Sequence, residues 1–140
     1  MNARCGEERI RAIDIVNDVL KDFKGTKIWQ FSDYCKLTDG ILREPYGGTN
    51  MGRAFVTLKN NNIKEFILLT DGQPDSETDA LFNAKGLKID IIYIGPQPTP
   101  QFLIDLAKMT NGNFTSIELF KLGNVGGKEL ENKIKGFLNA

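Results

Sequence analysis

The sequence predicts a single α/β domain with a doubly wound, mostly parallel sheet and helices on both faces. Its 140 residues suit one compact domain, and 41% apolar with 26% charged residues is ordinary globular usage. Apolar segments typical of buried strands alternate along the chain with amphipathic segments typical of helices. No linker, repeat or low-complexity tract interrupts this alternation, so residues 1–140 are expected to form one domain.

The first clear element is a helix. Ile10, Ile13, Val16 and Leu20 recur at steps of three or four residues, which predicts an amphipathic helix from about residue 7 that Gly25 ends. The aromatic-rich residues 27–35 then predict a strand. A loop with Gly and Pro follows, in which residues 41–44 are expected to add a short edge strand.

The rest of the chain continues the alternation of helix and strand. One apolar face predicts a helix from about residue 51, capped by Thr49 or Asn50 and stopped by the asparagines at 60–62. Strands are expected at 65–70, 88–95 and 113–119, the first two so apolar that both faces should be buried. Further helices are expected at 76–85, from Thr99 and Pro100 to near Gly112, and from about residue 127.

Composition excludes several classes of function. Lys plus Arg and Asp plus Glu are equal at 18 each and dispersed, so neither nucleic acid nor an anionic membrane is an expected partner. No apolar run approaches the roughly 18 residues needed to span a bilayer, and the N-terminus lacks the hydrophobic core of a signal peptide, which predicts a cytoplasmic protein. The chain has no histidine, which removes His-based catalysis and His metal ligands. Cys5 and Cys35 lack metal-ligand spacing and are expected to be reduced and structural.

Two oxygen-bearing residues are expected to meet at one rim of the sheet. Doubly wound sheets bind ligands beyond the carboxyl ends of their strands, and Asp71 directly follows the strand at 65–70. Thr49 closes the loop that leads into the preceding helix, so it should reach the same rim. Gly48 and Gly72 allow the tight turns that both loops need. Hydroxyl and carboxylate oxygens suit Mg²⁺ or Mn²⁺.

These segments resemble the von Willebrand factor A (VWA) domain. GGTNMGRAF (47–55) and ILLTDGQPDSE (67–77) are similar to two motifs of that family's metal ion-dependent adhesion site (MIDAS), with Thr49 and Asp71 at the ligand positions. Residues 27–33, 88–95 and 102–114 resemble its second strand, its fifth strand, and the helix and turn before its sixth strand. The resemblance covers nearly all of residues 7–138. It implies a VWA-like, Rossmann-like fold and a protein-interaction module in which a partner carboxylate completes the metal coordination.

One part of the family pattern is missing. The MIDAS begins with Asp-x-Ser-x-Ser at the end of the first, central strand, and nothing in MNARCGEERI matches it. With only Thr49 and Asp71 as ligands, a divalent cation is expected to bind weakly or not at all. The domain is therefore expected to be N-terminally incomplete, a chain that begins just inside a larger domain. Alternatively, it is a variant in which the second and fourth strands pair directly, or a strand from a partner or a second copy fills the gap.

An open gap in a folded monomer would contradict both explanations, because unpaired backbone groups at the centre of a sheet are costly. Simpler roles also stay open for the site residues. Thr49 is a candidate helix cap and Asp71 a candidate turn residue. Asp75 and Ser76 are expected to cap the next helix, with the metal rim as a second option for Asp75, and Asp33 is expected to form a turn. The aromatic side chains at 23, 29, 31, 55, 66 and 102 are expected in the core.

Three classes of function follow. The leading one is the interaction module with a partial MIDAS, which performs no catalysis. The first alternative is a metal-dependent hydrolase or phosphoryl-transfer domain using Asp71 and Asp75, although no nucleophile or general base is visible. Neither GxGxxG nor a P-loop motif follows a strand, so a nucleotide is not expected. The second alternative is a degenerate VWA-like structural subunit without metal.

Overall fold

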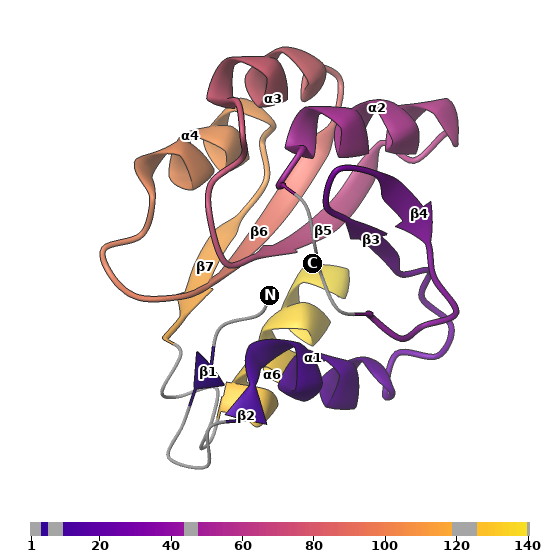
Figure 1. Ribbon diagram of the computed structural model, residues 1–140, viewed down its shortest axis with the longest axis vertical. Helices are drawn as coiled ribbons and strands as arrows, with labels where there is room; N and C mark the ends of the chain where they lie inside the picture. Colours follow the sequence, from indigo (N-terminus) through magenta and orange to yellow (C-terminus); the bar gives the residue numbers. More distant parts are fainter. Residues whose placement is uncertain (1–3, 6–9, 44–47, 119–125, 140) are drawn as a thin grey trace.

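The computed structural model describes residues 4–5, 10–43, 48–118 and 126–139, and its described part is an α/β arrangement in the predicted order (Figure 1). The strands are β1 (Arg4–Cys5), β2 (Ile10–Arg11), β3 (Trp29–Phe31), β4 (Cys35–Leu37), β5 (Glu65–Thr70), β6 (Lys88–Ile94) and β7 (Phe114–Ile117). The helices are α1 (Ala12–Leu20), α2 (Met51–Asn60), α3 (Glu77–Asn83), α4 (Gln101–Met109) and α6 (Gly127–Leu138).

The centre of the molecule is a parallel sheet of strands β5, β6 and β7, in that order. Leu68 of β5 lies opposite Ile91 of β6, which lies opposite Phe114 of β7. Two antiparallel pairs, β1 with β2 and β3 with β4, stand apart from this sheet. The strand β6 occupies the middle, and its residues Ile89 and Ile91 to Ile94 are all buried. Its near-continuous apolar sequence therefore matches its position.

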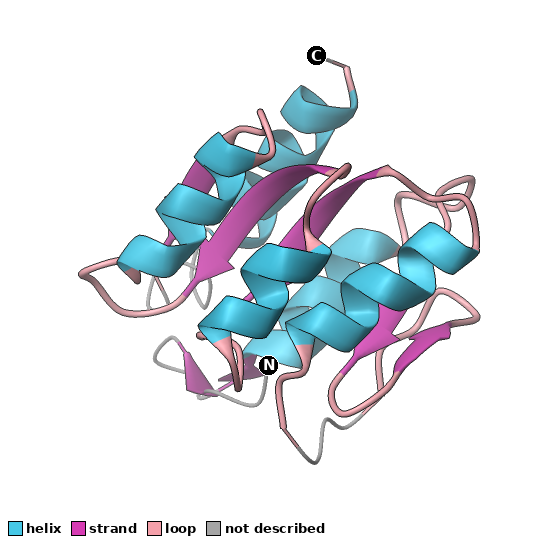
Figure 2. Cartoon of the chain, turned by 90° about the horizontal axis from the view of Figure 1, so that it is seen from above, coloured by secondary structure: helices cyan, strands magenta, loops and turns pink. Residues whose placement is uncertain are grey.

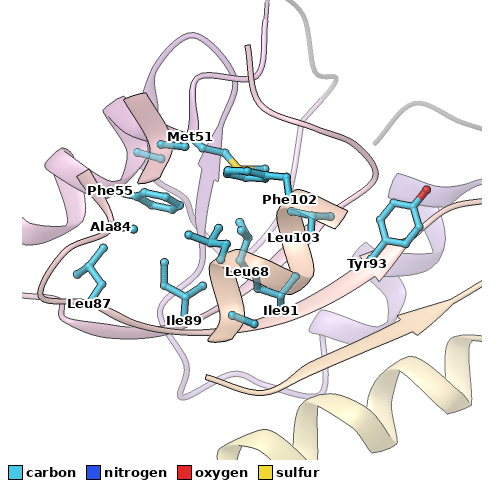
Figure 3. Close-up of a cluster of buried hydrophobic side chains, with 14 residues drawn as sticks. Met51, Phe55, Leu68, Ala84, Leu87, Ile89, Ile91, Tyr93, Phe102 and Leu103 are labelled. Carbon is cyan, nitrogen blue, oxygen red and sulfur yellow. The ribbon is translucent and has the colours of Figure 1, made fainter. Parts of the chain in front are cut away.

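Helices cover both faces of the sheet, which confirms the doubly wound α/β class (Figures 1 and 2). On one face α2, α3 and α4 pack on the strands through a cluster that includes Phe55, Leu68 and Ile91 (Figure 3). On the other face α1 and α6 pack through Val16 and Leu130 against Ile92 and other strand residues. The two crossovers between the parallel strands run through α3 and α4 on the first face, whereas the second face is covered by α1 and α6.

Several boundaries differ from the prediction at the N-terminal end. The first helix begins at Ala12, because Ile10 and Arg11 belong to β2, and it ends at Leu20, before Gly25. The predicted strand at 27–35 is a tight antiparallel hairpin, in which Phe31 pairs with Cys35. The predicted edge strand at 41–44 is wrong for residues 41–43, which form no strand, and residue 44 lies outside the described residues. The second strand of the hairpin, β4, was not predicted as a separate strand, because it is short, contains the polar Lys36 and follows β3 after an early turn.

The sheet is interrupted between β3 and β5. In the described residues β3 pairs only with β4, and β5 pairs only with β6. Direct pairing of these two strands, one of the alternatives for the missing strand, is therefore absent from the described residues, and the gap between β3 and β5 is open there. None of the helices in the described part of the chain is long and apolar enough to cross a membrane.

Candidate functional site

A cavity of about 650 Å³ occupies the space between β3 and β5. Its walls come from strand residues on two sides and from α1, α2 and α6. Thr49 and Asp71, the two residues predicted to meet at the rim, both line it. The topology and the loops thus bring residues 22 positions apart to one feature of the molecule. This cavity and its rim form the candidate site.

Thr49 does not cap the helix that follows it. The side chain of Asn50 takes that role by accepting a hydrogen bond of 3.0 Å from the backbone N–H of Arg53. The backbone of Thr49 is instead tied to Asp75: its N–H donates to Oδ1 at 3.0 Å, and its carbonyl accepts from the Asp75 N–H at 2.9 Å. The helix therefore needs nothing from the Thr49 hydroxyl.

Two aspartates hold the loop that presents Thr49. The Gly48 N–H donates to Oδ1 of Asp33 at 2.8 Å, and a Cβ at this position would overlap with the carboxylate of Asp75. A side chain at this position would have to displace the Asp75 carboxylate that holds the loop. Of the two residues expected to cap α3, Ser76 does so by accepting from the Asp79 N–H at 3.2 Å, whereas the expected capping role of Asp75 is wrong.

The positioning roles of Asp33 and Asp75 were missed by the sequence reasoning. Both had been assigned to local turns or caps, yet each accepts from the backbone of a loop distant in sequence. The available signal was weak: each is an acidic residue near the end of a strand or helix, close to the rim. Long-range acceptors of backbone N–H groups have no pattern of their own in a single sequence.

Asp71 lies at the carboxyl end of β5, half-buried, where a short turn presents it. The hydroxyl of Thr70 fixes this turn by donating to the carbonyl of Gly72 at 3.0 Å and accepting from its N–H at 3.3 Å. Burial raises the pKa of the nearby Tyr93 hydroxyl, and the negative charge of Asp71 raises it further. The Tyr93 hydroxyl points away from the core cluster (Figure 3) and donates to the Pro96 carbonyl at 2.8 Å. The Asp71 carboxylate is thus close enough to act on this group.

The oxygens of Thr49 and Asp71 are of the right chemical type for Mg²⁺ or Mn²⁺, which prefer hydroxyl, carboxylate and water ligands. They are few, however. Among the described residues, no group of three or more His, Cys, Asp or Glu side chains is arranged to hold a metal ion. The donor set fits a cation in kind, with most of the coordination left to water or to another molecule.

Cys35 also lines the cavity, and its thiol is expected to be weakly reactive. Burial raises the pKa of its thiol from 9.0 to about 11. The thiolate, which is the nucleophile and the metal ligand, is therefore scarce at neutral pH. This agrees with the structural role expected for Cys35.

Comparison with known proteins identifies relatives of the fold. No family model matches the sequence, and no curated protein matches it. Proximal thread matrix protein 1 from the mussel byssus is similar in structure, with a TM-score of 0.54 and 21% identity over 88% of this chain and 39% of its own. A von Willebrand factor type A protein from Catenulispora acidiphila has a TM-score of 0.53 and 20% identity over 86% of this chain and 36% of its own.

These likenesses support a VWA-like fold and nothing finer, because identity near 20% relates folds and not functions. The chain spans well under half the length of either structure.

Proposed function

We propose that this chain is a protein-interaction module of the VWA-like type, whose rim binds a divalent cation weakly through Thr49 and Asp71. A carboxylate of the partner protein then completes the coordination of the metal. The observation that carries the proposal is that both residues line one cavity, on loops whose geometry other residues fix. The Thr49 hydroxyl is spared from capping because Asn50 caps the helix.

The rim contributes binding and orientation. Asp75 and Asp33 hold the backbone at Thr49 and Gly48, and so fix the main chain from which the Thr49 hydroxyl extends. Asp71 supplies one anionic oxygen donor. A bound cation would supply positive charge able to attract a carboxylate from another protein. Two protein ligands leave the remaining coordination to water or the partner, which favours weak, partner-dependent binding.

The alternatives make different demands on the same residues. An enzyme that used Asp71 and Asp75 would need a free Asp75 carboxylate, yet that carboxylate accepts from the Thr49 backbone. The chain also has no histidine to serve as a general base. We therefore propose binding and not catalysis. A metal-free structural subunit would share the fold and make no use of the rim.

Melting temperatures measured in EDTA, Mg²⁺ and Mn²⁺ test the metal site. A cation at ten times its Kd stabilises the native state by about 1.4 kcal/mol, which raises the melting temperature of a domain of this size by several degrees. Asp71→Ala is expected to abolish the rise and Thr49→Val to reduce it. Asp18→Ala, which removes an exposed carboxylate on α1, is the matched control and should keep the full rise.

The possible results separate the three classes of function. A rise that depends on Asp71 supports the interaction module, and it is then tested by titrating a glutamate-containing peptide in Mg²⁺ and in EDTA. A melt that ignores metals in all variants would favour the structural subunit. Hydrolysis of a phosphate ester that Asp71→Ala abolishes without unfolding would favour the enzyme.

A further inference from the structure

The cavity is bounded by two strand edges that have no strand partner in the described part of the chain. β5 pairs through one edge with β6, and β3 pairs through one edge with β4. Residues of both strands line the cavity between them. Open edges of this kind are templates for pairing with another strand, and natural proteins usually cover them.

The register identifies which groups of β5 face the cavity. In a parallel ladder alternate residues direct their N–H and C=O groups to opposite neighbours. The Lys88 N–H donates to the Lys64 carbonyl at 2.8 Å, so the even-numbered residues of β5 bond to β6. The backbone groups of Ile67 and Leu69 consequently point to the open edge.

The same reasoning applies to β3. The Ser32 N–H donates to the Tyr34 carbonyl, and the Thr38 N–H to the Ile28 carbonyl, both at 2.9 Å. Hydrogen-bonded and non-hydrogen-bonded pairs alternate along an antiparallel ladder. The backbone groups of Trp29 and Phe31 therefore point away from β4, so two sets of backbone donors and acceptors border one cavity.

Side chains on the walls of the cavity are apolar on both faces. One wall is formed by Phe55 and Leu58 of α2, and the opposite wall by Val16 and Leu20 of α1, with further residues from α6. Four aromatic side chains predicted to be core are only partly buried, and all line this cavity: Phe23, Trp29, Phe31 and Phe66. The buried Nε1 of Trp29 also has no hydrogen-bond partner among the described residues.

We propose that the groove, the part of this cavity between the open edges of β3 and β5, binds an extended peptide strand of a partner protein. This strand is apolar on both faces and pairs with β5 on one side and β3 on the other. Its backbone would satisfy the open edges, and its side chains would cover the aromatic walls. A second copy of this chain is a poor donor, because its strands that are apolar on both faces, β5 and β6, are held in its own sheet. The proposal is independent of the metal.

The test is amide hydrogen exchange followed by NMR, on the whole chain in EDTA. The probe is a synthetic peptide with the sequence Lys-Val-Ile-Val-Ile-Val-Lys, acetylated and amidated, whose alternate side chains can face both walls. The control peptide has the same side chains, with N-methyl groups on its three valines. It lacks the N–H donors of one edge and cannot pair on both sides.

At saturating probe peptide, exchange of the Ile67, Leu69, Trp29 and Phe31 amides is expected to slow at least tenfold. The Phe66 and Leu68 amides, already bonded to β6, should change little. The control peptide should give no such pattern. This alternation distinguishes strand pairing from any other binding, because simple uptake of an apolar side chain would protect no particular set of amides.

Three results would overturn the proposal. The first is no binding of the probe peptide at peptide concentrations that leave the chain folded and monomeric. The second is binding with equal effect from the N-methylated control, which would mean that only side chains are taken up. The third is a free chain that sediments as a dimer with the Ile67 and Leu69 amides already protected, which would make a second copy the occupant.

Discussion

Leu68 and Leu69 are neighbours of one residue type on one strand, yet replacing each with alanine is expected to have different costs. Leu68 faces the cluster beneath α2, α3 and α4 and is only 6% exposed (Figure 3). Both side chains line the cavity, but Leu69 points to the opposite face of the strand and is only half-buried. The difference in stability between the two alanine variants therefore measures how loosely the groove side of β5 is packed in the free chain.

The magnitudes follow from what each side chain leaves behind. Leucine to alanine removes three carbons, a transfer loss of about 2.4 kcal/mol when they are fully buried. At Leu68 an enclosed cavity adds to this loss, which gives about 3–4 kcal/mol in total. At Leu69 burial is partial and the space is already open, so no new cavity forms and about 1–1.5 kcal/mol is expected. The predicted difference is therefore about 2 kcal/mol.

Urea denaturation of the two variants and the parent chain, followed by far-ultraviolet circular dichroism, gives both free energies of unfolding. The slopes against urea should be equal, so that the midpoints report stability alone. Equal losses for the two variants would refute the reasoning, because they would mean that the Leu69 side is as tightly packed as the core. Saturating probe peptide should increase the cost of Leu69→Ala more than that of Leu68→Ala, because Leu68 is already almost fully buried in the free chain.

Three further predictions concern single groups. Asp71→Asn should lower the pKa of Tyr93, because the charge that adds to the effect of burial is removed; NMR titration of the tyrosine ring carbons measures it, and an unchanged pKa would contradict their proximity. Iodoacetamide at pH 8 should modify Cys35 about 100-fold more slowly in the folded chain than in the urea-unfolded chain, since each unit by which the pKa is raised lowers the thiolate fraction tenfold. The rate in the folded chain should rise towards pH 11. Peptide mass spectrometry gives both rates, and equal rates would disprove burial of the thiol. Gly112→Ala should destabilise by at least about 2 kcal/mol, because its methyl group would overlap with a main-chain carbonyl of β6, whereas Gly136→Ala, in open space on α6, should stabilise by about 0.5–1 kcal/mol; thermal melts that ranked them otherwise would refute the packing argument.

The elements with strong local signals were predictable from sequence. The run EFILLT became β5 with the predicted bounds, and the helix with Phe55 on its apolar face became α2. Both signals act within a few residues: hydrophobic periodicity, a capping side chain and a stop at the asparagines. The meeting of Thr49 and Asp71 at one cavity was also predictable, because it follows from the topology of a doubly wound sheet.

Burial near the gap was not predictable, since it depends on a neighbouring strand and not on local sequence. Phe66 has the sequence environment of a core residue, yet it is only partly buried, because its own strand, β5, pairs on one edge only in the described residues. The sequence also left open whether Thr49 or Asn50 caps the helix, and Asn50 does. Both side chains can cap, and the contact of the Thr49 backbone with Asp75 decided which one does.

The groove and the rim are parts of one cavity, so their occupants cannot be energetically independent. Thr49 and Asp71 line the cavity that β3 and β5 border along their lengths. A strand in the groove would order the end of β5, and with it the turn that presents Asp71. If both occupants favour the same arrangement, each must raise the affinity of the other by the same factor. A weak cation site in the isolated chain is therefore compatible with a stronger one when the groove is filled, and the Mg²⁺-dependent rise in melting temperature should grow in the presence of the probe peptide.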